Sequence, residues 1–355
     1  MSVITVNGEI SKNELGITST HEHIFVELSK DIYEYERKPN SSLKDLKVNI
    51  EVLGLLNRNP FAIKDNLILS DSDVLKEELL KFKKAGGKTI VDPTTVDIGR
   101  NPVGLKKLSK ESGLNIITTT GYYRKRFHPK EVDELSLEGH IEKMVEEIEI
   151  GIGNTGVRAG MIGELGTSEI IYPEEEKILI AAARVNKELG VPIMVHFGAP
   201  WIVPGVSVRR LELDVLKILQ NNGANLEKVN LCHQDIFFDL DIISEAISMG
   251  SFISFDCFGE QFCFDPDFMY NPTDMERIKN LMKLIDKGFI NKILIACDTA
   301  FKQKLHKYGG WGYDHILTNI IPYLTHEGLS DNEINTLLIE NSKNFLNIEK
   351  SSIKK

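Results

Sequence analysis

The chain has 355 residues, of which 42% are hydrophobic and 26% are charged, as in an ordinary folded protein. Its formal net charge of −10 argues against a nucleic acid or an anionic membrane surface as a partner, because both would repel it. There is no signal-peptide pattern, no apolar run near the roughly 20 residues of a membrane span, and no Cys-x-x-Cys spacing among the four cysteines, so we expect a cytoplasmic protein.

Residues 1–15 alternate apolar and polar side chains around Asn7-Gly8, which predicts an N-terminal β-hairpin. Eight short apolar runs then follow, each ending in polar residues, and we expect each to be a strand. They cover residues 16–24, 88–94, 115–123, 159–166, 192–198, 229–235, 252–258 and 293–299. Stretches with helical periodicity lie between most of these runs, at 73–87, 139–151, 174–190 and 275–289, and 331–346 is expected to be the last outer helix.

Eight strands that alternate with helices predict an α/β protein with a single (β/α)8 TIM barrel over residues 1–355. Residues 25–75 form a long insertion after the first strand, which we expect beside the barrel mouth. A doubly wound open sheet is the alternative architecture. The candidate ligand and catalytic residues favour the barrel, because they stand at the ends of strands along the whole chain. Only a closed barrel brings the first and eighth strands together.

Ligand-type side chains stand at the ends of five of the predicted strands. His21 and His23 lie two apart in the first strand, so both should project from one face, although a His-x-His pair alone is a weak signal. Four further residues each close another apolar run: Glu164, His196, His233 and Asp298. Strand ends face the pocket in such a barrel, whereas a single strand-end histidine could simply bond a loop carbonyl. The recurrence predicts a metal site.

Four imidazoles and two carboxylates exceed the needs of one four-coordinate zinc ion. Two divalent ions about 3.5–4 Å apart, sharing a hydroxide, would use all six groups. The expected ligands divide into three for one ion, two for the other and one bridge: His21, His23 and Asp298, then His196 and His233, then Glu164. Asp298 could also accept the proton of the attacking hydroxide, which predicts a hydrolase.

This arrangement resembles the phosphotriesterase family of the amidohydrolase superfamily. The likeness extends to the flanking segments GVRAGMIGELGTSE, VPIMVHFG, VNLCHQD and YGGWGYDHILTNIIPYL, and covers essentially the whole chain. It implies a (β/α)8 barrel with a binuclear centre, commonly of zinc, that hydrolyses esters, lactones or phosphoesters. It also implies that the protein could be a homodimer.

One position departs from the pattern of many members of that family. The position that matches their metal-bridging carboxylated lysine is Gly163, and no lysine lies in this strand. Glu164 follows, which resembles the branch called phosphotriesterase homology proteins, where a glutamate takes the bridge. Because adjacent strand residues point to opposite faces, Glu164 needs a local shift to reach the metals.

The substrate is suggested by residues near the predicted catalytic face. Tyr123 matches a tyrosine that the family's lactonases hold beside the metals, although it could also be an aromatic side chain that only packs. Two loops are locally basic in an acidic chain, and they supply Arg124, Arg126, Lys302 and Lys304 as candidate contacts to an anionic group. Solvated loop charge is the alternative interpretation of each.

These residues favour a lactonase that opens a small polar lactone, such as a phosphorylated sugar lactone. A phosphotriesterase, another ester hydrolase or an acyl-homoserine lactonase is the alternative. An amide hydrolase or deaminase on the same scaffold is a further alternative, since it would share the His-x-His pair and the aspartate of the eighth strand. A metal-binding barrel without turnover is the non-enzymatic alternative, and Asp298 argues against it, because a structural metal needs no proton acceptor.

Overall fold

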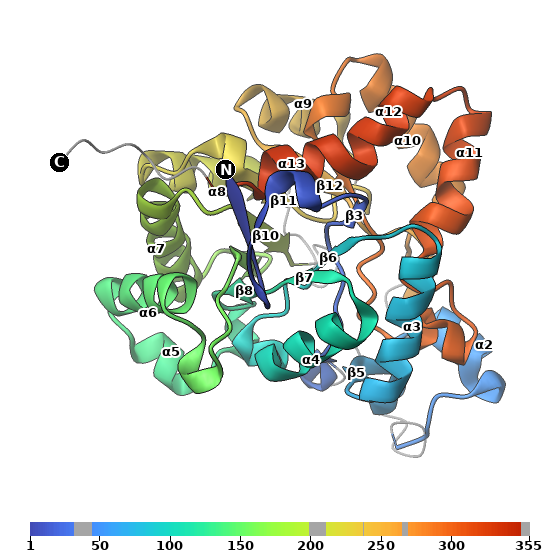
Figure 1. The fold of residues 1–355 in the computed structure, drawn as a ribbon, viewed down its shortest axis with the longest axis horizontal. Coiled ribbons are helices and arrows are strands. Elements are labelled where there is room, and N and C mark those ends of the chain that lie inside the picture. Colours follow the sequence, from blue (N-terminus) through green and yellow to red (C-terminus); the bar gives the residue numbers. More distant parts are fainter. Residues whose placement is uncertain (32–44, 199–210, 237, 265–268, 349–355) are drawn as a thin grey trace.

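The computed structural model describes residues 1–31, 45–198, 211–236, 238–264 and 269–348. A ring of helices surrounds a central set of parallel strands (Figure 1). The barrel strands are β3 (Thr18–Ser19), β6 (Thr89–Val91), β7 (Asn115–Ile117), β8 (Thr119–Thr120), β9 (Met161–Thr167), β10 (Ile193–Phe197), β11 (Val229–Leu231), β12 (Phe252–Phe255) and β15 (Ile293–Ile295). Each of the eight predicted apolar runs contains one strand, or the β7–β8 pair.

Helices occupy all five stretches in which the helical periodicity predicts them, and further helices lie between the other strands. They are α2 (Leu53–Arg58), α3 (Ser72–Lys84), α4 (Pro102–Ser112), α5 (Lys130–Glu134), α6 (Leu137–Glu149), α7 (Pro173–Leu189), α8 (Leu211–Asn221), α9 (Leu240–Ser248), α10 (Asp274–Asp286), α11 (Ile321–His326), α12 (Asp331–Asn335) and α13 (Asn341–Leu346). A π-helical turn over 336–340 joins α12 to α13, so the predicted helix 331–346 is continuous. Within the described ranges, no helix combines the length and apolar character that crossing a membrane requires.

The barrel wall consists of two parallel sheets, with the orders β3-β6-β7 and β8-β9-β10-β11-β12-β15. β7 and β8 are consecutive pieces of one strand, separated by Thr118, and so connect the two sheets. The last strand meets the first through hydrogen bonds from Asp298 N to His21 O (3.0 Å) and from Thr20 Oγ1 to Ile295 O (3.3 Å). The predicted (β/α)8 barrel is therefore confirmed, and the open-sheet alternative was wrong.

The barrel core follows from the two-residue period of a strand. Ile90, Ile116 and Ile253 belong to clusters that include helix residues such as Leu105 of α4 and Ile278 of α10. The strand residues of opposite orientation form a separate buried cluster: Val91, Ile117, Met161, Met194, Phe252 and Leu294. Because successive side chains point to opposite faces of a strand, one set packs inside the barrel and the other against the helices.

The N-terminal hairpin is formed by β1 (Ser2–Thr5) and β2 (Gly8–Ser11), and it crosses the centre of the barrel in the view of Figure 1. Gly8 has a φ of +118°, which a glycine adopts without strain, as the Asn7-Gly8 turn predicts. Val6 N donates to Ile116 O (2.9 Å), and Val3 joins the buried cluster inside the barrel. The hairpin therefore covers the barrel end opposite to the strands' carboxyl ends.

The inserted segment after β3 carries the short antiparallel pair β4 (Val26–Glu27) and β5 (Ile68–Leu69) and helix α2. Phe61 packs against Phe264 and Phe301, with ring centres 6.0 and 5.7 Å away. Those rings belong to the loops after β12 and β15, and the first of these loops also contains the short pair β13 (Cys263–Phe264) and β14 (Met269–Tyr270). The insertion thus lies beside these two loops, while residues 32–44 of its predicted range lie outside the described residues.

Candidate metal centre

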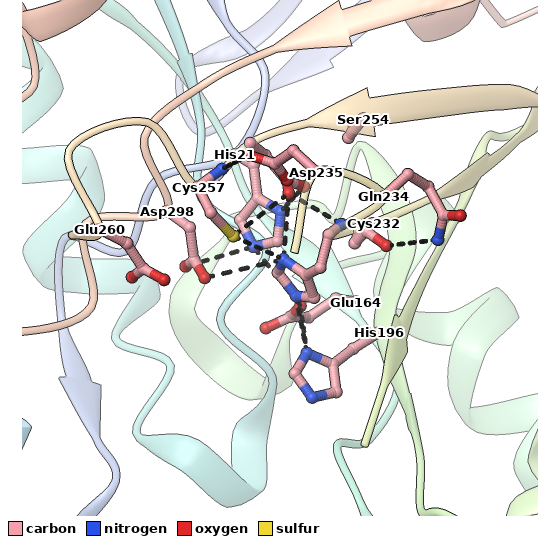
Figure 2. Close-up of polar contacts among 12 residues, drawn as sticks. His21, Glu164, His196, Cys232, Gln234, Asp235, Ser254, Cys257, Glu260 and Asp298 are labelled. Atoms are coloured by element: carbon pink, nitrogen blue, oxygen red, sulfur yellow. Dashed lines mark hydrogen bonds and ion pairs between the residues drawn. The ribbon is translucent and has the colours of Figure 1, made fainter. Parts of the chain in front are cut away.

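The six predicted ligands are gathered at the carboxyl ends of the barrel strands: His21, His23, Glu164, His196, His233 and Asp298. Figure 2 shows four of them, His21, Glu164, His196 and Asp298. Glu164 lies in the middle of this cluster. Its carboxylate oxygens are 3.3–3.6 Å from one ring nitrogen of each of the four histidines. Asp298 Oδ1 lies 3.6 Å from His21 Nε2 and 3.3 Å from His23 Nε2.

His21 and His23 lie beyond the first strand, which ends at Ser19, and not within it as predicted. Strand alternation therefore does not bring the two rings together. Their orientation comes from the second ring nitrogen of each: His21 Nδ1 lies 2.8 Å from Asp256 Oδ2, and His23 Nδ1 lies 2.7 Å from Thr94 Oγ1. With Nδ1 held by an oxygen, each ring presents Nε2 to the cluster.

Glu164 reaches the cluster because β9 carries a bulge. Along β10, Ile193 and Val195 are two residues apart, whereas their partners on β9, Ile162 and Leu165, are three apart. The extra residue turns the Glu164 side chain to the interior, which is the local shift that the sequence required. Gly163 has a φ of +97°, and a Cβ at this position would lie 2.0 Å from the backbone oxygen of Met194. The bulge therefore needs glycine at 163.

Asp256 is a component of the site that the sequence reasoning missed. Its carboxylate is fully buried and contacts the Nδ1 atoms of both His21 (2.8 Å) and His233 (3.0 Å), and it also accepts a hydrogen bond from His233 N (2.8 Å). One carboxylate thereby orients two rings. Asp256 directly follows β12, so the same search for ligand-type residues at strand ends could have found it.

The donor atoms fit a bound divalent cation. Three buried atoms that face one another have no hydrogen-bond partner among the described residues: His21 Nε2, Glu164 Oε2 and Asp298 Oδ1. Five groups of possible ligand atoms in the described part of the chain lie within 4.8 Å of one another, and two of them consist only of predicted ligands: His21, His23 and Asp298, and His21, Glu164 and His233. The first group matches the three residues predicted for one ion. Unpaired buried lone pairs on nitrogen and carboxylate oxygen are the donor set that transition metals prefer.

The electrostatics of the cluster also favour positive charge at its centre. Burial alone would lower the pKa of His23, but the Asp298 and Glu164 carboxylates outweigh it and raise this pKa to about 9. Burial would raise the pKa of Asp298, but His21 and His23 lower it to about 2. His196 is different, because burial dominates over Glu164 and lowers its pKa to about 4. Burial would likewise raise the pKa of Glu164, but His21 and His196 lower it well below its usual range. Both carboxylates are therefore ionised, and a cation would replace the protons on the imidazoles.

The comparisons with known proteins agree with this geometry. The model of the Phosphotriesterase family matches residues 1–346. The chain belongs to the phosphotriesterase family. N-acetyltaurine hydrolase of Danio rerio is a similar relative, 36% identical, with 97% of each chain covered. The family contains metal-dependent hydrolases, and the chain has the clustered side chains that such chemistry needs.

Two solved structures are also similar over nearly their full length. A resiniferatoxin-binding protein from Rhodobacter sphaeroides has a TM-score of 0.90 at 32% identity, covering 98% of this chain and 95% of that one. The phosphotriesterase homology protein from Escherichia coli, complexed with phosphate in its active site, has a TM-score of 0.76 at 30% identity. The match covers 94% of this chain and 99% of that one.

Tyr123 and Arg124 lie beside the metal cluster of this family member. Tyr123 is buried, and its hydroxyl lies 3.0 Å from His196 Nε2. The Arg124 guanidinium carbon lies 5.3 Å from the centre of the Tyr123 ring, and this side chain is only 5% exposed. The positive charge of Arg124 is one of the causes, after burial, of the low pKa of His196. A guanidinium is thus buried next to a predicted ligand.

The other predicted substrate contacts already bond to protein groups. Arg126 donates to Lys30 O (2.6 Å). Lys302 pairs with Asp65 Oδ1 (2.8 Å). Lys304 is buried and pairs with Glu260 Oε1 (3.1 Å), and it also donates to Asp298 O (3.1 Å). These contacts connect loops to one another, whereas Arg124 lies over the ring of Tyr123, whose hydroxyl contacts the predicted ligand His196.

Proposed function

We propose that this phosphotriesterase-family protein hydrolyses the amide bond of a small N-acylated amine that carries a negative charge, of which N-acetyltaurine is the type. The observation that carries this proposal is the Arg124 guanidinium, buried 5.3 Å from the Tyr123 ring, whose hydroxyl contacts the His196 ring of the metal cluster. A cation buried at that point suits a sulfonate or carboxylate on the amine part of the substrate.

The choice of an amide over an ester rests on relatives. The proteins that match this chain at 33–36% identity over 97% of its length include N-acetyltaurine hydrolases of fish and human. A metal-dependent hydrolase of an amide and one of an ester need the same first step, addition of hydroxide to a carbonyl carbon. The amide needs in addition a proton for its leaving nitrogen.

The chain's own residues can supply these steps. Divalent cations held by the six predicted ligands would polarise the carbonyl oxygen and lower the pKa of water. Asp298, ionised with a pKa of about 2, accepts the proton of the attacking water and returns it to the amine nitrogen as the C–N bond breaks. The Tyr123 hydroxyl, 3.0 Å from His196 Nε2, is placed to hydrogen-bond the substrate beside His196, and Arg124 holds the anionic end.

A lactone is the second candidate, and Tyr123 favours it. Its hydroxyl lies at the edge of the cluster, 3.0 Å from His196 Nε2, where it would meet the ring oxygen of a lactone. The phosphorylated lactone expected from the sequence would place its phosphate at the same guanidinium. The two candidates differ in the bond that is cut and share the contact with Arg124.

The test compares matched substrates with the metal-loaded protein. Release of free amine is measured from N-acetyltaurine and from N-acetylethanolamine, a neutral amide of similar size, and acid release is measured from lactones with and without a phosphate. We expect amide turnover with a preference for the sulfonate. Lactone turnover without amide turnover would replace the first candidate by the second, and no turnover of either would refute both.

Arg124→Met tests the anionic contact. It should raise the KM for N-acetyltaurine roughly 10–100-fold, the loss expected for a hydrogen-bonded charge pair, and leave neutral substrates unchanged. Arg126→Met is the matched control, because this arginine is two residues away and donates to Lys30 O. Equal effects of both variants would mean that Arg124 does not contact the substrate.

A further inference from the structure

Glu22 stands between two predicted metal ligands, yet its own side chain bonds elsewhere. It is fully buried, and its carboxylate accepts three hydrogen bonds. Oε1 accepts from Ser19 Oγ (2.8 Å) and from Cys297 N (2.9 Å), and Oε2 accepts from Thr299 N (2.9 Å). The last two donors are the backbone N–H groups of the residues before and after Asp298. Glu22 thus binds the backbone on both sides of Asp298, the predicted catalytic residue.

Asp298 needs this support because its backbone conformation is unusual. Its φ of +46° lies in the left-handed region, which a non-glycine residue rarely adopts without support. Strand β15 ends at Ile295, so the N–H groups of Cys297 and Thr299 have left the sheet ladder and need other acceptors. A carboxylate is the side chain that offers two acceptor oxygens at once.

The other hydrogen bonds of the segment around Asp298 do not involve the N–H groups of Cys297 and Thr299. Asp298 N donates to His21 O (3.0 Å), and Lys304 Nζ donates to Asp298 O (3.1 Å). These bonds hold the N–H and C=O groups of Asp298 itself, and Lys304 Nζ also donates to Cys297 O, which leaves the N–H groups of Cys297 and Thr299. Glu22, which lies between His21 and His23, accepts from these two N–H groups. It therefore fixes the position of the Asp298 carboxylate relative to the two predicted imidazole ligands.

We propose that Glu22 is a positioning residue that fixes the carboxylate of Asp298 against His21 and His23 by binding the backbone on both sides of it. It takes no part as a metal ligand. The inference rests on the role of Asp298 in the proposed function, and it explains why a buried acid, rather than an apolar residue, occupies the middle of the His-Glu-His segment.

Glu22→Gln is the deciding variant, because glutamine offers one acceptor oxygen and one NH2 group, so one flanking N–H loses its acceptor. We expect kcat to fall roughly 10–100-fold with KM within about twofold, as for a displaced catalytic group. The visible absorption spectrum of the Co²⁺-loaded protein should move toward that of Asp298→Asn, which reports loss of this carboxylate independently of turnover.

Glu78→Gln is the matched control. Glu78 is also buried, and it accepts from two backbone donors in the same loop, His306 N (3.0 Å) and Lys307 N (3.2 Å), but these lie beyond the segment around Asp298. Its loss should lower Tm by a similar amount and leave kcat and the Co²⁺ spectrum unchanged. A general loss of rigidity would affect both variants alike.

The proposal is overturned if Glu22→Gln leaves the Co²⁺ spectrum as in the wild type, or if its kcat falls no more than that of Glu78→Gln at equal loss of Tm. If Glu22→Gln does not fold, Glu22→Asp takes its place, since its carboxylate is one methylene too short to reach both N–H groups. An unchanged spectrum there overturns the proposal too. If the wild-type protein cleaves neither amide nor lactone, the proposed function fails, and the Co²⁺ spectrum alone decides the role of Glu22.

Discussion

Asp298 combines a backbone conformation that the protein must support with a carboxylate that the reaction must use. Asp298→Asn separates the two, because the amide has nearly the same shape and its backbone keeps the bond to His21 O. We expect kcat to fall about 10²–10⁴-fold, the usual contribution of a general base, with little change in the Tm of the metal-free protein. Amine release and thermal unfolding measure both effects. A variant that keeps its activity would contradict the assigned role.

Because of His140, we expect the folded protein to become less stable in mild acid. The ring is buried in α6, 5.5 Å from the ring of Tyr122, and burial, followed by the charges of Lys177 and His128, lowers its pKa from 6.5 to about 4. Between pH 6.5 and pH 4 the unfolded chain binds a proton here and the folded chain does not. Stability is therefore complete above about pH 6.5 and is lost as the pH falls toward 4.

His140→Leu removes this titration. The difference in Tm between pH 7 and pH 5 should be smaller for the variant than for the wild-type protein, measured at equal metal loading. His326→Leu serves as a control, because this histidine lies at the exposed end of α11, where replacement should leave the pH dependence as it is. Equal acid sensitivity of His140→Leu and the wild-type protein would mean that His140 is protonated in the folded state.

The bulge in β9 makes a single glycine decisive for a whole strand. In Gly163→Ala the new methyl group meets the backbone oxygen of Met194 at a left-handed φ, so both strain and overlap oppose it. We expect a loss of about 2–5 kcal/mol in the free energy of unfolding, and a loss of activity as Glu164 is displaced. Denaturant unfolding measures the first effect.

Gly288→Ala is the matched control for the bulge. Gly288 also has a left-handed φ, +84°, but a Cβ there would meet no atom within 4 Å. Its loss should be about 1–2 kcal/mol, the cost of the conformation alone. If both variants lose the same free energy of unfolding, the close approach of β9 to Met194 does not contribute to the requirement for glycine at 163. The same reasoning predicts that Gly163→Lys cannot supply a bridging lysine.

The loop after β15 is tied to the inserted segment by bonds that use its basic residues. Lys302 pairs with Asp65, and Asn66 exchanges two hydrogen bonds with Gln303, at 2.8 and 2.9 Å. Lys302→Met should therefore lower stability by about 0.5–1 kcal/mol and leave the KM for anionic substrates unchanged. This is the reverse of the pattern expected for Arg124→Met. A raised KM in Lys302→Met would instead support the contact between Lys302 and the substrate that the sequence predicts.

The sequence predicted the helices and the order of the strands well because these depend on local periodicity. It predicted strand ends poorly at the site: the run 16–24 contains a strand of two residues, because His21 and His23 are held by Asp256 and Thr94 and not by a ladder. The partners of the basic residues also escaped prediction. Asp65 and Glu260 lie far along the chain from Lys302 and Lys304, and no spacing rule connects them.

The metal cluster draws its ligands from segments between residues 21 and 298, so a bound cation would cross-link strands from both ends of the chain. Such binding stabilises only the folded state, by about 2.7 kcal/mol at a metal concentration 100 times Kd. Removing the metal with a chelator should therefore lower Tm by roughly 5 °C or more and abolish hydrolysis. Addition of Zn²⁺ after dialysis should restore both, which separates metal loss from damage by the chelator.

The number of ions distinguishes a binuclear centre from a single site. Glu164 has one oxygen near His23 (3.3 Å) and the other near His21 (3.4 Å), His196 (3.3 Å) and His233 (3.6 Å), so this carboxylate reaches the ligands predicted for both ions. We expect metal analysis to return close to two ions per chain in the wild-type protein. In Glu164→Gln the neutral bridge should lower this number and the Tm gain on adding Zn²⁺ together. A wild-type value near one would contradict the binuclear centre, because four imidazoles and two carboxylates would then surround a single ion with more donors than its four positions can take.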